Sequence, residues 1–242
     1  MAAAAPRRDG YFEDQLLTRV SADGKVLEEV SVSDIIYNSD WMALLFAGRG
    51  STFSMADDDP LHLNDVEMLR PEMAGAFPMF DAGDLLVSLR NLQTVVVVGG
   101  KDHLIKWTMT GPFFGQHDAD FAPNGHIILF DNRISGHTPQ LGYSKVLEID
   151  PSTRRVTWSY SGSDAEPFYS DMGGRVQWLS NGNILVGEPQ GGRVFELARD
   201  ADGSGKIVWE YVNLIEPGTV GVLFDVQRVP TVTEPWVGKA CS

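Results

Sequence analysis

Two histidines and one arginine in this chain are placed where they could act together on an anionic group. His62 and His117 lie 55 residues apart, and each begins a run of strand-forming residues. Arg90 closes the strand that follows His62. A neutral imidazole is a good nucleophile and proton carrier, and a guanidinium presents a planar fork to an oxyanion. These residue types are suited to nucleophilic group transfer. The alternative is a purely structural role, in which the two histidines form hydrogen bonds and the arginine forms a surface ion pair.

A sequence repeat indicates which fold would position these side chains. Trp107, Trp158 and Trp209 fall 51 residues apart, each in a similar local phrase. A period of this size, with every unit made of short strands and turns, is typical of a β-propeller. Asn-Gly and Asp-Pro turns divide each unit into four strands. We therefore predict an all-β chain, folded as a β-propeller of four-stranded antiparallel blades.

Three full blades and two partial ones can be read along the chain. The full blades begin at His62, His117 and Gly174 and end in the three repeated tryptophan phrases. Residues 17–30 look like the last hairpin of an earlier blade, and Val222 to Arg228 look like the first strand of a later one. We expect residues 1–242 to form a single propeller domain.

Residues 31–61 fit no blade and are expected to be an irregular insertion. They contain an apolar run from Trp41 to Phe46, which favours a short helix, and an acidic run from Asp57 to Asp59. A further insertion, residues 71–80, lengthens the first hairpin of the first full blade.

The first strand of each propeller blade lines the central channel, and its start faces the funnel where ligands bind. Matched positions at these strand starts suggest the residues of a site. We expect catalytic roles for His117, His62 and Arg90, and substrate binding by Asn64, Asp118 and Arg175.

Composition limits the partners of the chain. A formal net charge of −14 argues against nucleic acid or an anionic membrane surface. The one cysteine, Cys241, excludes an internal disulfide and a cysteine-based metal site, and no complete calcium loop or zinc-protease motif is present. We predict neither a metal nor a cofactor. The apolar runs are too short for a transmembrane segment, and the start of the chain lacks the apolar stretch of a signal peptide.

Several phrases resemble the bacterial arylsulfotransferase family. They are His62-Leu-Asn-Asp-Val-Glu, Gly83-Asp-Leu-Leu-Val-Ser-Leu-Arg90, Gly-Pro-Phe-Phe-Gly-Gln-His117-Asp and Leu179-Ser-Asn-Gly-Asn-Ile-Leu-Val. The resemblance runs from about residue 61 to 228. It implies a six-bladed propeller that moves a sulfuryl group from an aryl sulfate to a phenol through a sulfohistidine, without a metal or nucleotide donor. His117 matches the family's nucleophile, and His62 and Arg90 match groups that bind the sulfuryl oxygens.

Within this resemblance, Asp118 or Asp120 is a candidate for fixing the His117 tautomer, although neighbouring strand residues point to opposite faces. The family's proteins are usually exported to the periplasm, and its further histidine in an earlier blade has no match here. The chain is thus expected to correspond to the C-terminal two-thirds of a family member, or to a shortened relative.

Two other functions compete with sulfuryl transfer. One is a non-catalytic propeller that binds an anionic ligand or a protein partner. The other is a quinone-dependent dehydrogenase, which shares the tryptophan phrases but whose adjacent cysteines and metal ligands are missing. A propeller with missing blades would expose sheet faces, which favours association between copies of the chain.

Overall fold

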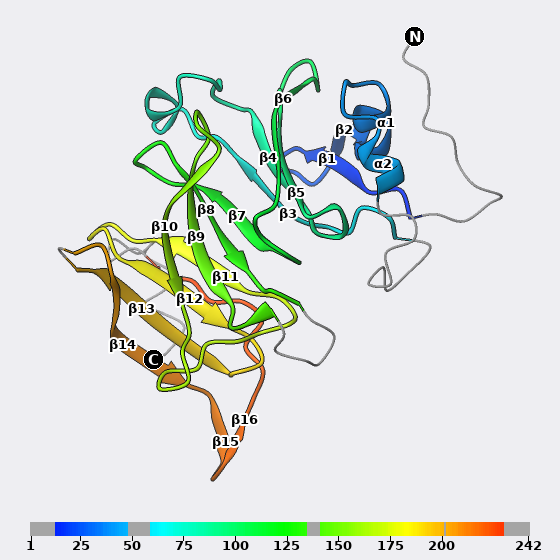
Figure 1. Cartoon of the computed structure of the whole chain (residues 1–242). Coiled ribbons are helices and arrows are strands. Elements are labelled where there is room, and N and C mark those ends of the chain that lie inside the picture. Colours follow the sequence, from blue (N-terminus) through cyan, green and yellow to red (C-terminus); the bar gives the residue numbers. More distant parts are fainter. Residues whose placement is uncertain (1–12, 48–58, 135–140, 201, 230–242) are drawn as a thin grey trace.

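Three similar β-sheets are the main structural elements of the protein. The computed structural model describes residues 13–47, 59–134, 141–200 and 202–229. Each of the three sheets contains four antiparallel strands that follow one another in sequence (Figure 1). The first sheet comprises β3 (Leu63–Met68), β4 (Leu85–Leu89), β5 (Thr94–Val98) and β6 (Ile105–Thr110). The second comprises β7 (His117–Phe121), β8 (Ile127–Asp131), β9 (Lys145–Asp150) and β10 (Arg155–Ser161). The third comprises β11 (Arg175–Trp178), β12 (Ile184–Glu188), β13 (Arg193–Arg199) and β14 (Gly205–Val212).

The first strands of the three sheets lie next to one another. Strand β7 contacts β3 on one side and β11 on the other, so the sheets fan out from a line of inner strands (Figure 1). Radial packing of four-stranded antiparallel sheets by their first strands is the arrangement of propeller blades. The predicted fold class is therefore confirmed, and the three full blades match the three predicted units.

Two apolar layers hold neighbouring blades together. Between the first and second blades, Trp107 and Phe121 are buried together with Leu86 and Leu129. Between the second and third, the rings of Phe130 and Phe168 meet edge to face with centroids 5.2 Å apart. Burying one such side chain contributes about 1.5–3 kcal/mol, so these layers fix the angle between blades.

The repeated tryptophans have a shared structural role in these layers. Trp107 Nε1 donates to the Pro151 carbonyl at 2.9 Å, and Trp158 Nε1 donates to the Gly203 carbonyl at 2.7 Å. In each case this hydrogen bond joins the fourth strand of one blade to the turn between the third and fourth strands of the next blade. Trp209, on the outer strand of the third blade, has 47% of its surface exposed.

Polar side chains also join the inner strands. Asp65 accepts a hydrogen bond from the Ala119 N–H at 3.2 Å, and Glu67 accepts one from the Phe121 N–H at 2.5 Å. These carboxylates satisfy backbone donors of β7 that face β3, so the two inner strands are held in register without direct backbone pairing.

The segment before the first full blade forms a hairpin and two short helices. The predicted hairpin is present as β1 (Leu16–Val20) and β2 (Val26–Ser31). Helix α1 (Val32–Tyr37) begins where the Ser31 side chain accepts from the Asp34 N–H at 3.0 Å. Helix α2 (Leu44–Ala47) falls at the end of the apolar run for which a short helix was predicted. Among the described residues, no helix is long and apolar enough to cross a membrane.

The prediction of a strand from Val222 to Arg228 is wrong. This segment is irregular, and the short hairpin of β15 (Leu214–Glu216) and β16 (Thr219–Val220) precedes it. Leu223 and Val226 do pack on the third blade. However, no described strand pairs with this segment, and side-chain contacts from Gln177 take the place of a backbone ladder.

Three regions that the sequence singled out lie outside the described residues. They are the start of the chain, the first two residues of the acidic run, Asp57 and Asp58, and the cysteine Cys241. The six-blade count and the single-domain boundaries remain predictions, because the described residues contribute three complete blades.

Candidate active site

One end of the β3–β4 hairpin brings His62 and Arg90 together. Leu63 pairs with Leu89 in this hairpin, so the residues just outside that pair are neighbours. The Arg90 N–H donates to the His62 carbonyl at 3.1 Å and closes the hairpin end. Two residues 28 positions apart in the sequence therefore share one end of the first blade.

The matching end of the β7–β8 hairpin holds His117. His117 pairs with Phe130 across the hairpin, and Asn132 lies just beyond the end of β8. The Nδ1 atom of His117 is 2.8 Å from Asn132 Oδ1 and 3.1 Å from the Gly115 carbonyl oxygen. Both partners of this ring nitrogen are oxygens.

The orientation of the Asn132 amide follows from its other bonds. Its Nδ2 donates to the carbonyls of Ser170, at 2.9 Å, and Gly173, at 2.5 Å. The Oδ1 atom must therefore face His117, and only a protonated Nδ1 can bond to both Oδ1 and the Gly115 carbonyl. This leaves the lone pair of the neutral ring on Nε2, so Nε2 is the ring atom of His117 that can act as a nucleophile.

The tautomer of His117 is thus fixed by Asn132 and Gly115, and not by Asp118 or Asp120 as the sequence suggested. The Asp118 carboxylate instead accepts from the Val176 N–H at 2.5 Å and contacts the Arg175 guanidinium. Asp118 lies at a register shift of β7, between the paired residues His117 and Asp120, and its backbone is left-handed with φ of 50°. Its side chain reaches β11 while the His117 ring bonds to Asn132.

Burial keeps the His117 ring neutral. The pKa of His117 falls from 6.5 to about 4, chiefly through burial, and the positive charges of Arg90 and His62 lower it further. The hairpin whose end holds His62 and Arg90 packs against β7, and Asn64 bonds to the residue directly before His117. The structure therefore brings together the three residues for which catalytic roles were predicted, and it presents His117 in the form that can attack an electrophile.

Arg90 offers hydrogen-bond donors to this space. Its Nη1 donates to Asn91 Oδ1 at 3.3 Å, whereas its buried Nε has no hydrogen-bond partner among the described residues. Burial lowers the pKa of Arg90, and the charges of Asp59 and Asp171 oppose that change. Because an unpaired buried donor costs about 1–3 kcal/mol, this guanidinium is suited to an anionic ligand that would satisfy it.

His62 is held by an acidic residue three positions before it. Its Nδ1 lies 2.5 Å from Asp59 Oδ2, and its backbone N–H donates to Asp59 Oδ1 at 2.8 Å. The Asn91 Nδ2 group donates to the Asp59 carbonyl at 2.7 Å, which ties this segment to the end of β4. The His62 backbone is left-handed, with φ of 48°.

The three predicted substrate-binding residues lie at the interfaces of the inner strands. Asn64 Nδ2 donates to the Gln116 carbonyl at 2.8 Å, directly before His117, while its Oδ1 has no partner among the described residues. Asp118 and Arg175 contact each other, and Arg175 Nε also lies 3.2 Å from Asp225. Direct binding of substrate by these three residues stays a prediction.

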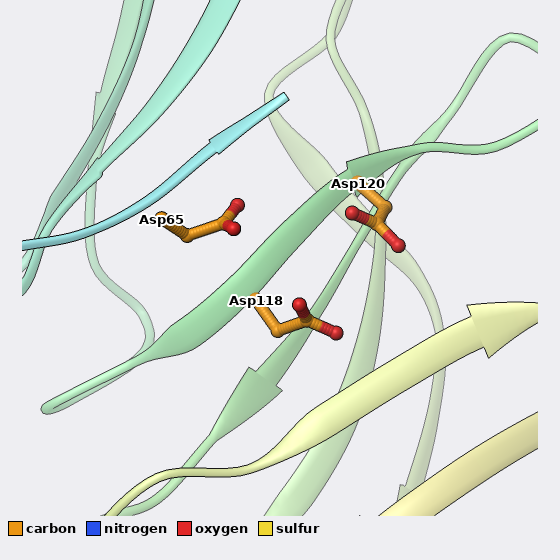
Figure 2. A group of neighbouring side chains, drawn as sticks. All are labelled: Asp65, Asp118 and Asp120. Carbon is orange, nitrogen blue, oxygen red and sulfur yellow. The ribbon is translucent and has the colours of Figure 1, made fainter. Parts of the chain in front are cut away.

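A group of carboxylates lies between the inner strands, apart from the His117 contacts. Oxygens of Asp65, Asp118 and Asp120 all lie within 4.8 Å of one another. Figure 2 shows that Asp65 reaches from β3 toward the other two, which project from β7. Burial raises the pKa of Asp65 to about 7 and those of Asp118 and Asp120 to about 8.

These carboxylates are the described residues that could hold a metal ion, because hard cations prefer oxygen ligands. However, Asp118 is paired with the Arg175 guanidinium, and Asp65 accepts a backbone N–H. The negative charge of the three carboxyl groups is therefore offset by bound protons, by the Arg175 guanidinium and by a backbone N–H group.

Sequence reasoning missed two residues of the site, Asn132 and Asp59. Asn132 stands at a strand end equivalent to that of Arg90, and this alignment was a usable signal. Asp59 belongs to the acidic run before His62, and its spacing of three residues was the only signal of a contact.

Comparison with known proteins supports the family that the sequence resembles. The family model for arylsulfotransferase (ASST) matches residues 2–214. None of the curated proteins compared with the chain matches it.

Solved structures with similar folds were also found. They include the WD40 β-propeller domain of Doa1, with 15% identity over 60% of this chain and 40% of that one, at a TM-score of 0.42. Virginiamycin B lyase from Staphylococcus aureus has 12% identity over 79% of this chain and 47% of that one, at a TM-score of 0.46. BamB from Moraxella catarrhalis has 14% identity over 57% and 36%, at a TM-score of 0.35.

The chain thus spans less than half the length of each of these three structures. Since the TM-scores are below 0.5, the blade assignment rests on the sheets of the chain itself. The family match covers most of the 242 residues and includes both histidines and the arginine of the site. The chain belongs to the arylsulfotransferase family.

Proposed function

We propose that the protein is an aryl-sulfate sulfotransferase that moves a sulfuryl group from an aryl sulfate to a phenolic acceptor through His117. Family membership supports sulfotransferase activity in general. The observation that supports this mechanism is the bonding of His117. Its Nδ1 is held by two oxygen acceptors, and its Nε2 lone pair, on which the charge of Arg90 acts, has no hydrogen-bond partner among the described residues.

The first step transfers the sulfuryl group to the protein. The Nε2 lone pair of His117 attacks the sulfur of the aryl sulfate, and an N–S bond forms. The S–O bond to the aryl group breaks, and its electron pair leaves with the phenolate oxygen. A neutral imidazole is required, because a proton on Nε2 would occupy the attacking lone pair.

The second step reverses the first with a new phenol. The acceptor oxygen attacks the sulfur of the sulfohistidine, and the N–S electron pair returns to Nε2. Over the two steps the hydroxyl proton of the acceptor passes to the phenolate released in the first step, so the products are a phenol and a new aryl sulfate. Neither step needs an oxidant or a reductant, since the sulfuryl group keeps its oxidation state.

Arg90 and His62 would act on the charged oxygens. The Arg90 Nε group, which lacks a partner among the described residues, is a donor available to a sulfuryl oxygen. A preorganised donor of this kind stabilises charge as it moves toward the departing phenolate. Removing one such donor from an enzyme typically costs about 100- to 1,000-fold in rate.

Transfer between two phenols tests this function. We expect the His117→Ala variant to lose sulfuryl transfer from 4-nitrophenyl sulfate to phenol while it remains folded. His103→Ala is a matched control, because His103 lies 3.7 Å from Glu28, away from the site. Retained transfer in His117→Ala would contradict the proposal. Saturable binding of the aryl sulfate by the wild-type protein without any transfer would favour the non-catalytic binding propeller.

A further inference from the structure

We propose that Asp59 makes His62 the proton carrier of this site, a role that rests on the proposed sulfuryl transfer. His62 would give a proton to the departing phenolate and later take one from the acceptor phenol. The proposal goes beyond binding of sulfuryl oxygens, the role that the resemblance implies for His62. Asp59 would be a positioning residue, since it acts on the substrate only through the ring of His62.

The contacts of Asp59 fix which nitrogen of His62 faces the substrate. One carboxylate oxygen lies 2.5 Å from Nδ1, and the other accepts the backbone N–H of the same residue at 2.8 Å. A carboxylate at this distance requires a proton on Nδ1. Nε2 is then the atom that gains and loses a proton at the site.

Several features hold this pair rigid. The Asp59 side chain is 13% exposed, and its backbone carbonyl accepts from Asn91 at 2.7 Å. The left-handed backbone of His62, with φ of 48°, is a conformation that costs energy for a residue other than glycine. The bonds from Asp59 to both the backbone and the ring of His62 stabilise that conformation.

The two histidines of the site are consequently in different environments. His117 is held by neutral oxygens and has a pKa of about 4, so it is suited to attack as a neutral ring. His62 has an anionic partner that would stabilise the imidazolium formed when Nε2 takes a proton. Two like groups placed in unlike surroundings are a common way to separate a nucleophile from an acid–base group.

Over one catalytic cycle, His62 regains the proton that it gives up. As the S–O bond breaks, protonated His62 transfers its Nε2 proton to the phenolate oxygen and becomes neutral, with Nδ1–H still bonded to Asp59. When the acceptor phenol attacks the sulfohistidine, His62 Nε2 takes the acceptor proton. Asp59 remains ionised throughout, and no outside acid or base is consumed.

Donors with different leaving groups test the proposal. A nitrophenolate leaves readily without a proton, whereas an unsubstituted phenolate gains much from a general acid. In single turnovers followed by formation of the His117 adduct, we expect Asp59→Asn to slow phenyl sulfate by about 100-fold. The same variant should slow 4-nitrophenyl sulfate by less than about threefold.

Asp171→Asn is the matched control. Asp171 acts on the charge of Arg90, as Asp59 does, but its side chain forms no hydrogen bond with either histidine among the described residues. Its replacement should change the rates of the two donors by equal factors. Equal slowing of the two donors in Asp59→Asn would overturn the proton-carrier role and leave sulfuryl transfer standing. A wild-type protein that forms no His117 adduct with either donor would overturn both proposals.

The wild-type protein provides a second test if Asp59→Asn fails to fold. We expect a solvent deuterium isotope effect on adduct formation with phenyl sulfate and a much smaller one with 4-nitrophenyl sulfate. Equal isotope effects for the two donors would contradict proton transfer from His62.

Discussion

The Nδ1 atom of His117 is held by two oxygens, and its Nε2 atom makes no hydrogen bond with the described residues. Asn132 is the residue responsible for this arrangement, because it bonds to the ring and also to two carbonyls that precede β11. The site therefore depends on contact between the second and third blades. A nucleophile whose orientation depends on a neighbouring blade is sensitive to changes outside its own strand.

Replacing Asn132 should impair transfer without removing the nucleophile. In Asn132→Ala the Nδ1 proton loses its nearer acceptor, so the ring can rotate or adopt the other tautomer. We expect the rate of His117 adduct formation to fall at least about tenfold. Asn124→Ala, which removes a turn side chain bonded to Glu148, is the control. Rates equal to wild type in Asn132→Ala would show that Gly115 alone suffices to orient the ring.

The pH dependence of the donor half-reaction follows from the state of His117. Its pKa of about 4 means that the ring is neutral, and Nε2 free, at every pH above that value. With 4-nitrophenyl sulfate, the rate of adduct formation should be level from pH 8 to about pH 5 and should fall below about pH 4. A rate that declines already below about pH 6.5 would indicate an imidazole with an ordinary pKa.

At the scale of the elements, the inner strands β3 and β7 bring the carboxyl groups of Asp65, Asp118 and Asp120 close together. Asp120 makes no hydrogen bond with the described residues, and burial and the charges of Glu67 and Asp65 raise its pKa from 3.8 to about 8. When folding raises the pKa of a carboxyl group, that group stabilises the folded state most at pH values below its pKa in the unfolded chain. This contribution is lost as the pH rises through the folded pKa, so the cluster should weaken the fold between about pH 4 and pH 8.

Asp120→Asn should therefore stabilise the protein at pH 8 and change little at pH 4.5. Removing an ionisable group from this cluster is expected to raise the free energy of unfolding at pH 8 by about 1–3 kcal/mol. Urea unfolding at both pH values measures this, with the exposed Asp40→Asn as the control. A loss of stability at pH 8 would mean that the Asp120 carboxylate has a stabilising partner, such as a bound cation.

The repeated tryptophans allow a second test of how the blades pack. Trp107→Phe removes the hydrogen bond to Pro151, made at 2.9 Å, from a fully buried position. We expect it to lower the free energy of unfolding by about 1–3 kcal/mol, because the Pro151 carbonyl loses its partner. Trp209→Phe, on the outer strand of the last described blade, should change stability by less than about 0.5 kcal/mol. Equal effects would mean that the repeat is not related to packing between blades.

The sequence predicted the strands well because turn residues and the tryptophan period both mark them. Strand β7 begins at His117, where the second blade was predicted to begin, and the repeated tryptophans lie on the last strand of each blade. His62, Arg90 and His117 were selected from their positions at strand ends. The alignment of strand ends marked the position of Asn132, but its bond to the His117 ring was not predictable, since it depends on how the second blade meets the residues before β11. The segment from Val222 to Arg228 has the composition of a strand, but it pairs with no strand among the described residues, and composition alone cannot supply a partner strand.

For the molecule as a whole, apolar surface is exposed at both ends of the row of blades. Val66 and Met68 of the first blade are 47% and 53% exposed. They line a cavity of about 920 Å³ between the β1–β2 hairpin and the first sheet, apart from His62, Arg90 and His117. Trp209 and Tyr211 are 47% and 49% exposed on the last blade. Exposed apolar side chains on a sheet face favour association between copies of the chain.

We predict that copies of the chain associate with one another. Sedimentation over a wide range of protein concentrations should give masses above the 26.6 kDa of one chain. Met68→Glu places a charge on the exposed face of the first blade and should shift the population toward monomers. A mass of one chain at every concentration would contradict association between copies.

The most direct test of the account is the mass of the protein after brief incubation with an activated aryl sulfate and no acceptor. We predict a gain of one sulfuryl group, located on His117 by peptide mapping and removed when a phenol is added. Folded protein that gains no sulfuryl group, or gains one on another residue that then passes to phenol, would contradict His117 as the nucleophile.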